Sequence, residues 1–178
     1  RVNVHHKLAM TIRELEKSQT KLQEQARTDP LTNLMNRREL FEQGNIIIAQ
    51  AKRYNTNCSV IVIDLDHFKQ INDQHGHPAG DQILVRISSL LKELARDVDT
   101  VARMGGEEFA VLLPDTSRLG AAVLAERMCA TVYNDIITID GKTIHATISA
   151  GIASYPNEPI NGFDDLLKIA DRRLYNAK

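Results

Sequence analysis

Carboxylate side chains stand at two points where an apolar strand is expected to end. The first is Asp64, which follows the β-branched run at 60–63, and the second is the pair Glu107 and Glu108. Carboxylates that crowd together repel one another and raise each other's pKa, and a divalent cation removes that penalty. Oxygen ligands without His or Cys suit a hard ion such as Mg²⁺, which usually takes one or two protein carboxylates. If the two strands are neighbours in one sheet, these side chains therefore predict a magnesium site at its edge.

Two glycines, Gly105 and Gly106, precede the glutamates and have a specific use there. Glycine adopts positive φ without strain, and its lack of a side chain lets a phosphate chain approach the backbone closely. The alternative is a solvated hairpin in which Glu107 and Glu108 are simply exposed. The Gly-Gly-Glu-Glu string alone therefore assigns no site.

The elements that would position these side chains alternate irregularly along the chain. Hydrophobic periodicity and capping residues predict helices at 37–54, 66–74, 78–95, 117–133 and from 163 onwards, with Asn36 as the first N-cap. Apolar runs and turn residues predict strands at 58–65, 100–104, 108–113 and 146–153, with a hairpin around Asp140-Gly141. Hairpins among the strands favour an α+β fold, with a mostly antiparallel central sheet flanked by helices, over a doubly wound parallel sheet.

Residues 1–27 are expected to form a helical stalk ahead of a domain at 28–178. A coiled-coil a/d seam recurs there at alternating spacings of four and three, through Leu8, Ile12, Leu15, Gln19, Leu22 and Ala26. Such a short helix is marginal alone, so the seam predicts a partner. We expect a parallel dimer stalk, and the alternative is an amphipathic helix folded back on its own domain. Pro30 ends the helix because it forces the preceding residue out of the helical region.

The composition argues against several classes of protein. The 178 residues carry a formal net charge of −1 and 4% aromatic residues, which argues against a nucleic-acid polymer as partner. No apolar run approaches the ~18–20 residues of a membrane span, and Cys58 and Cys129 are expected to be packed thiols in a reducing cytosol. Because the chain begins at Arg1, we expect a cytoplasmic piece of a longer protein, with a sensory domain upstream and a membrane anchor left open.

Five segments, in order and with compatible spacings, resemble the GGDEF family of diguanylate cyclases, here with a GGEEF signature. They cover roughly residues 27–178 and are Thr28–Arg38, Asp64–Asp73, Gly76–Asp81, Arg103–Phe109 and Ala170–Lys178. The resemblance implies a ferredoxin-like core of the nucleotidyl-cyclase and polymerase-palm kind. It also implies an enzyme that condenses two GTP into cyclic di-GMP and two pyrophosphates, by attack of a 3′-hydroxyl on an α-phosphate.

The resemblance also implies how metal is held. In this family the first aspartate after the core strand and the third residue of the signature are ligands, which places these roles on Asp64 and Glu107. Leu65 would add its backbone carbonyl, and the set would hold two Mg²⁺ ions, with Mn²⁺ as a substitute. One ion activates the 3′-oxygen, and both neutralise charge on the α-phosphate and the leaving pyrophosphate. Glu107 or Glu108 is expected to assist proton transfer, and the choice of base stays open. Asp66 is expected to cap the following helix rather than bind metal.

Guanine recognition is implied for Asn72 and Asp81. A carboxylate accepts both N1–H and N2–H of guanine and an amide serves the remaining edge atoms, whereas adenine would leave Asp81 unpaired. The lysines among the other implied substrate-binding residues would contact phosphate; this set is Phe68, Lys69, Gly105, Gly106 and Lys178. The family places an arginine a few residues beyond Lys178, a position that this sequence does not include.

Assembly and feedback are implied as well. Two bonds between two GTP molecules require two domains that face each other, so we expect a homodimer whose stalk sets the positions of the catalytic domains. Arg96 and Asp99 match the family's RxxD site, at which cyclic di-GMP inhibits, with Arg127 as a further contributor. Arginine forks onto a guanine face or a phosphate, and aspartate accepts from guanine N–H groups. The alternative is an ion pair at a helix end, between Arg96 and Asp97 or Asp99.

The main alternative function is a catalytically inactive domain that only binds cyclic di-GMP as an effector. Degenerate hairpins mark such proteins, and the hairpin here is intact. A polymerase-like enzyme or a mononucleotide cyclase would share the two carboxylates, but Asn72 and Asp81 stand in register for guanine. A pure dimerisation module would leave the acid-rich strand ends without a role.

Overall fold

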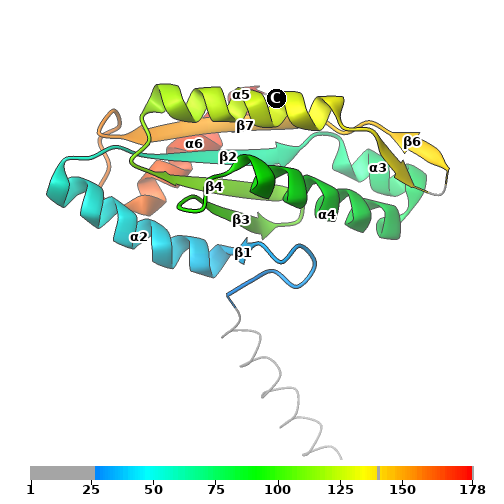
Figure 1. Ribbon diagram of the computed structural model, residues 1–178, viewed down its shortest axis with the longest axis horizontal. Helices are drawn as coiled ribbons and strands as arrows, with labels where there is room; N and C mark the ends of the chain where they lie inside the picture. The colour runs from blue at the N-terminus through cyan, green and yellow to red at the C-terminus, as the bar shows by residue number, and fades with distance from the viewer. Residues whose placement is uncertain (1–26, 140, 178) are drawn as a thin grey trace, which may run out of the picture.

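A five-stranded sheet forms the centre of the domain (Figure 1). Its strands lie in the order β1 (Met35–Asn36), β3 (Thr100–Gly105), β4 (Glu108–Pro114), β2 (Cys58–Leu65) and β7 (Ile148–Tyr155). β1 pairs with β3 in parallel, and the other three pairs are antiparallel. The predicted α+β class, with a mostly antiparallel sheet, is therefore confirmed. The computed structural model describes residues 27–139 and 141–177, so the predicted stalk at 1–27 lies outside the described residues, apart from Arg27.

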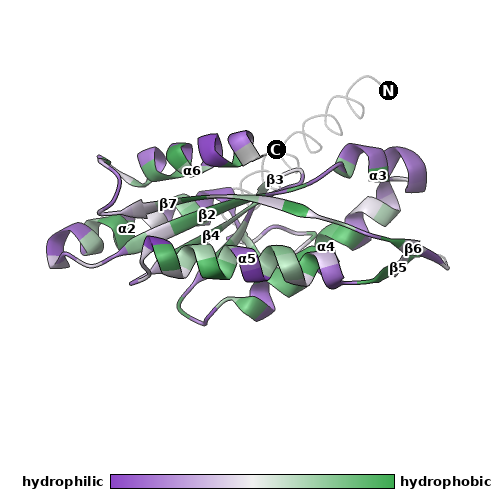
Figure 2. Cartoon of the chain, turned by 90° about the horizontal axis from the view of Figure 1, so that it is seen from above, coloured by the Kyte–Doolittle hydropathy of each residue, from purple (hydrophilic) through white to green (hydrophobic). Residues whose placement is uncertain are grey.

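Helices cover both faces of this sheet, as the view from above shows (Figure 2). On one face lie α2 (Arg37–Tyr54) and α6 (Phe163–Ala177), and on the other lie α4 (His77–Leu94) and α5 (Arg118–Asn134). The short α3 (Phe68–His75) follows β2 and packs against α4. A second, two-stranded sheet joins β5 (Ile137–Ile139) to β6 (Lys142–Ile144). No helix within the described ranges is both long and apolar enough to cross a membrane.

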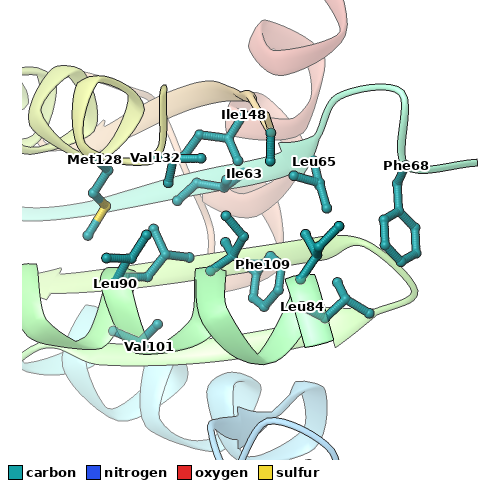
Figure 3. Close-up of a cluster of buried hydrophobic side chains, with 14 of the residues drawn as sticks. Ile63, Leu65, Phe68, Leu84, Leu90, Val101, Phe109, Met128, Val132 and Ile148 are labelled. Carbon is teal, nitrogen blue, oxygen red and sulfur yellow. The ribbon is translucent and has the colours of Figure 1, made fainter. Parts of the chain in front are cut away.

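Side chains of β2 alternate between the two faces of the sheet, and this builds both halves of the core. The even-numbered residues at 58–62 are buried against α2 and α6, whereas Ile61, Ile63 and Leu65 are buried against α4 and α5. Figure 3 shows the half of the core that faces α4 and α5, with Ile63 and Leu65 among side chains from β4, α4 and α5. The same alternation directs Asp64, the next even-numbered residue, to the face covered by α2 and α6.

Most element boundaries lie within two residues of their predicted positions. Asn36 caps α2 as predicted, because its side chain accepts a hydrogen bond from the backbone N–H of Glu39 at 3.0 Å. The two-residue β1 was not predicted, since it is too short to show a pattern. It joins the sheet through its parallel pairing with β3, in which Met35 lies opposite Ala102, and Met35 also forms an antiparallel bridge with Thr28.

One local prediction is wrong, because Asp66 does not cap α3. The helix begins after His67, which has a φ of 57° and makes no side-chain capping hydrogen bond. The Asp66 carboxylate instead accepts hydrogen bonds from the hydroxyls of Thr147 at 2.8 Å and Ser149 at 2.7 Å. It therefore ties the loop after β2 to the start of β7.

Candidate active site

The ends of β2 and β4 meet at one edge of the sheet, as the sequence predicted. In the antiparallel register of these strands, Asp64 is the direct partner of Glu108. One residue further on, the backbone N–H of Leu65 donates to the carbonyl oxygen of Glu107 at 3.2 Å. The acidic residues of both segments are thus gathered by main-chain pairing, which sets their spacing independently of their side chains.

The hairpin between β3 and β4 turns through Gly105 and Gly106, whose φ angles are +138° and +54°. Any other residue would be strained in these conformations. A β-carbon at either position would meet no atom within 4 Å, so space is not the reason for glycine here. The glycines therefore serve the turn conformation, and they leave open room beside it.

Arg103 ties this hairpin to the segment before β1. Its guanidinium donates to the carbonyl oxygen of Gly106 at 2.7 Å and forms an ion pair with Asp29 at 3.1 Å. Partial burial alone would raise the pKa of Asp29, but hydrogen bonds from Thr32 and Arg103 outweigh it and lower the pKa. Neither Arg103 nor Asp29 was predicted to support the site, because a separation of 74 residues leaves no local signal of their contact.

Negative charge accumulates at this edge of the sheet. Desolvation raises the pKa of Glu108, and the carboxylates of Asp64, Asp171 and Glu107 raise it further. Across 27–139 and 141–177, no three His, Cys, Asp or Glu side chains converge into a complete metal cage. The predicted set consists of two carboxylates and the carbonyl of Leu65, which is oxygen only, and a hard divalent cation would offset the repulsion. The residues present therefore fit Mg²⁺.

The predicted guanine contacts, Asn72 and Asp81, lie on α3 and α4, which pack together. Oδ1 of Asn72 is buried and has no hydrogen-bond partner among the described residues. Asp81 is exposed and directly follows Gly80, where a β-carbon would lie 2.0 Å from that same Oδ1. A buried polar atom left without a partner costs about 1–3 kcal/mol, so this unpaired acceptor of Asn72 would suit a ligand that donates a hydrogen bond.

The other predicted substrate-binding residues outside the glycine turn are Phe68, Lys69 and Lys178, and they differ in their surroundings. Phe68 is 9% exposed and belongs to the core beside α4, so its side chain packs against the protein. Lys69 is exposed in the first turn of α3, as a phosphate contact requires. Lys178 lies outside the described residues.

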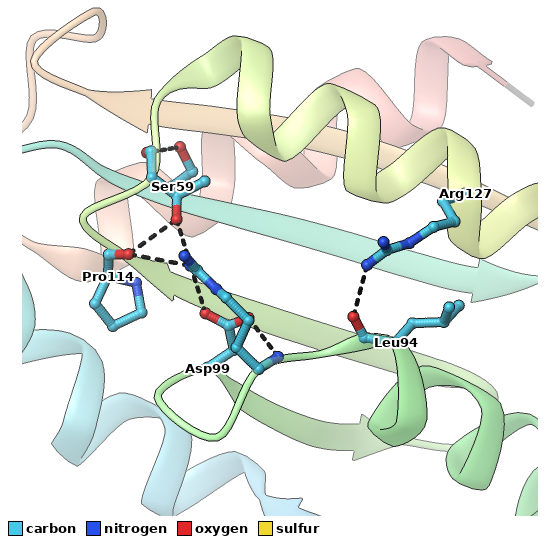
Figure 4. Close-up of polar contacts among 7 residues, drawn as sticks. Ser59, Leu94, Asp99, Pro114 and Arg127 are labelled. Carbon is cyan, nitrogen blue, oxygen red and sulfur yellow. Dashed lines mark hydrogen bonds and ion pairs between the residues drawn. The ribbon is translucent and has the colours of Figure 1, made fainter.

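Two of the predicted inhibitory residues, Arg96 and Asp99, directly precede β3, so they lie at the opposite end of this strand from the glycine turn, about 20 Å away for a strand of this length. Arg96 forms an ion pair with Asp99 at 2.8 Å, and the Asp99 side chain is 1% exposed. The ion pair predicted as the alternative is therefore present. Arg127 on α5 donates to the carbonyl oxygen of Leu94, at the end of α4, at 2.8 Å (Figure 4). The Arg96 guanidinium also donates to Oγ1 of Thr116 at 2.7 Å, so the two exposed arginines contact different segments.

The sheet flanked by helices and the acidic strand ends beside a glycine turn define an α+β domain of the polymerase-palm type. Residues 26–178 match the family described as diguanylate cyclase, GGDEF domain. The chain belongs to the GGDEF family, which confirms the resemblance seen in the sequence.

Known relatives support this membership. The chain is 38% identical over 163 residues to diguanylate cyclase A of Treponema denticola, covering 89% of this chain and 43% of that protein. It is 34% identical over 178 residues to cyclic di-GMP phosphodiesterase NbdA of Pseudomonas aeruginosa, covering 100% and 22%. The chain therefore spans less than half of the length of either relative. The GGDEF domain of DgcB from Caulobacter crescentus, solved in complex with c-di-GMP, has a TM-score of 0.79 and 31% identity, covering 84% and 86%.

Proposed function

We propose that this domain is a diguanylate cyclase, which condenses two GTP molecules into cyclic di-GMP and two pyrophosphates. The observation that carries the proposal is the meeting of Asp64 with Glu107 and Glu108 at one sheet edge. The unpaired acceptor of Asn72, on the helix that follows β2, adds a site for a base. Membership in the GGDEF family and a relative named diguanylate cyclase support the same reaction. A place in the cytoplasm, where GTP is available, follows from this substrate.

Asp64, Glu107 and the backbone carbonyl of Leu65 would hold two Mg²⁺ ions, or Mn²⁺ in their place. When bound, such ions lower the pKa of a hydroxyl and offset the negative charge of phosphate oxygens. The protein's own contribution is rigidity, because Asp64 and Leu65 stand on β2, and Glu107 stands in the β3–β4 hairpin whose second strand pairs with β2.

The remaining site residues would bind and orient the substrate. Asp81 accepts N1–H and N2–H of guanine, and Asn72 serves the rest of that edge, so the base is fixed between α3 and α4. Lys69 and Lys178 contact the phosphates with flexible ammonium groups. The glycines at 105–106 let those phosphates approach the hairpin backbone.

The reaction exchanges one phosphorus–oxygen bond for another. The 3′-oxygen of one GTP attacks the α-phosphorus of the other, the bond from that phosphorus to the bridging oxygen breaks, and pyrophosphate leaves. The proton of the 3′-hydroxyl passes to Glu107 or Glu108. The second bond forms in the same way in the opposite direction, which requires two domains face to face. A homodimer is therefore part of the proposal, with the stalk at 1–27 setting the positions of its domains.

Incubation with GTP and Mg²⁺, followed by assays for cyclic di-GMP and pyrophosphate, tests the proposal. Asp64→Ala and Glu107→Ala should each lower the rate by at least about 100-fold, since each removes charge stabilisation at the reacting phosphate. The matched control Glu126→Ala, an exposed carboxylate on α5, should leave the rate unchanged. EDTA should stop the reaction, and Mn²⁺ should restore it. Absence of cyclic di-GMP, or a full rate in Asp64→Ala, would refute the assignment.

The second candidate function is a catalytically inactive effector that binds cyclic di-GMP. The observation that favours it is the likeness to the GGDEF domain of DgcB, which was solved in complex with c-di-GMP. Calorimetry with cyclic di-GMP and the cyclase assay separate the two candidates. Tight binding without turnover of GTP would establish the effector.

Product inhibition through Arg96, Asp99 and Arg127 completes the proposal. Its support is the exposure of the guanidinium groups, with the Arg96 side chain 57% exposed beside the buried Asp99. Arg96→Ala should keep the initial rate and abolish the slowing of the reaction as cyclic di-GMP accumulates. Arg53 is an exposed arginine on α2, and the rate of the Arg53→Ala variant should fall as cyclic di-GMP accumulates, as it does in the unaltered domain. Unchanged slowing in Arg96→Ala would exclude a role for this site.

A further inference from the structure

Gly80 stands in the first turn of α4 and packs against Asn72 of α3. A β-carbon at Gly80 would lie 2.0 Å from Oδ1 of Asn72, 3.0 Å from its Cγ and 3.1 Å from Cζ of Phe68. The backbone of Gly80 is helical, so no positive φ requires glycine there. Glycine in a helix is less favourable than alanine. The reason for this glycine is therefore the space that the Asn72 amide occupies.

The amide that fills this space carries an acceptor with no use inside the protein. Oδ1 of Asn72 is buried and makes no hydrogen bond to any described residue. Buried side-chain oxygens are almost always paired, and exceptions call for an explanation such as a ligand. Asp81, the residue after Gly80 on α4, is exposed, and its carboxylate carries two further acceptors.

The donors on the edge of guanine match these acceptors in number. That edge presents N1–H and two N–H groups of the exocyclic 2-amino group. Asp81, as proposed above, takes N1–H and one of the amino hydrogens through its two oxygens. One amino hydrogen remains, and Oδ1 of Asn72 is the acceptor left for it. Inosine has the same ring edge without the 2-amino group, so it cannot make this bond.

We propose that Gly80 is a positioning residue, which holds the Asn72 acceptor in line for the 2-amino group of guanine and so makes the site prefer GTP to ITP. The inference rests on the proposed function, since it concerns the base site of that reaction. It assigns to Gly80 an effect that acts only through Asn72.

Gly80→Ala is a suitable test because the protein can accommodate it. The atom nearest to the new methyl group is the free end of a flexible side chain, which can rotate away, and the Phe68 ring needs to shift by only a few tenths of an ångström. The variant should therefore fold with the Asn72 amide displaced. Gly162→Ala is the matched control, because a β-carbon at Gly162 meets no atom within 4 Å.

The experiment measures direct binding of GTP and of ITP by calorimetry, together with turnover of both, for five proteins. These are the unaltered domain, Gly80→Ala, Asn72→Ala, the double variant and Gly162→Ala. Loss of one hydrogen bond with a buried partner should lower the GTP-to-ITP preference of Gly80→Ala by about tenfold or more. Its affinity for ITP should stay within about threefold of the unaltered value, and the double variant should match Asn72→Ala.

Three results would overturn the inference: an unchanged preference in Gly80→Ala, an equal loss for GTP and ITP, or a further loss in the double variant. Thermal unfolding of each variant identifies any that fail to fold, and Asn72→Ala then carries the same comparison of GTP with ITP. Failure of the proposed function looks different, because the unaltered domain would then make no cyclic di-GMP.

Discussion

Replacement of Gly151 by alanine should push α6 away from the sheet and destabilise the domain. Gly151 is buried on β7 opposite Val62, and α6 crosses directly over it. A β-carbon there would lie 2.1 Å from the carbonyl oxygen of Ala170 and 2.3 Å from the backbone nitrogen of Leu174. Both are backbone atoms, so no side-chain rotation relieves the contact. The helix would have to withdraw by roughly 1 Å or more to restore an ordinary separation.

The free energy of unfolding should fall by about 1–3 kcal/mol or more, the usual range for an overpacked core. In an unhindered position the same substitution should stabilise a protein by about 0.4–1 kcal/mol, because alanine restricts the unfolded chain. The sign of the effect therefore reports the contact itself. For a domain of this size, each 1 kcal/mol corresponds to about 2–4 °C in Tm.

Urea denaturation followed by circular dichroism measures the change, with the thermal midpoint as a second reading. Gly162→Ala serves as the control, since its β-carbon would meet no atom within 4 Å, and it should be as stable as the unaltered domain or up to about 1 kcal/mol more stable. A Gly151→Ala domain as stable as the unaltered one would refute the reasoning that this glycine sets how closely α6 approaches β7.

Three other features lead to testable expectations. Hydrogen bonds from Arg27 and Gln43 lower the pKa of the buried Glu39 from its usual 4.5, so its charged form stabilises the fold above that pH, and this stabilisation is lost as the pH falls through the lower folded pKa. Glu39→Gln should flatten the loss of stability in urea midpoints measured below about pH 4.5, and an equal loss in both proteins would contradict this. Burial raises the pKa of the Cys58 thiol to about 12, so iodoacetamide should modify it only after denaturation; mass spectrometry showing equal labelling of the native domain would refute this. Arg103→Met should cost about 1–3 kcal/mol in urea denaturation, because it removes charge-assisted hydrogen bonds to Asp29 and the hairpin; an unchanged midpoint would show that the anchor does not stabilise the fold.

Much of the fold could be predicted because the signals for it are local. The apolar run at 58–65 is a strand buried on both faces, and its side-chain alternation follows from backbone geometry alone. Asn36 caps α2 because its short polar side chain reaches a backbone N–H three residues away. The convergence of the acidic strand ends was also predictable, since two apolar strands ending in acid need only be neighbours to bring those ends together.

The parts that could not be predicted depend on partners distant in the chain. Asp66 is a residue type that often caps helices, but its carboxylate accepts from the hydroxyls of Thr147, just before β7, and Ser149, on β7, more than 80 residues away. Arg103 reaches Asp29 only because β1 pairs beside β3. The place of Gly105 and Gly106 between two predicted strands indicated their positive φ, but nothing local indicated that Gly80 and Gly151 make room for neighbouring segments.

The sequence by itself determined which segments become strands and helices, where the carboxylates stand at their ends, and the family to which the chain belongs. Only the tertiary structure decided which acid meets which, where an amide oxygen is left unpaired, and how closely α6 lies on the sheet. The physical reason is that hydrophobic periodicity and capping act within a few residues. Register and close packing, in contrast, depend on contacts between segments that the folded chain brings together.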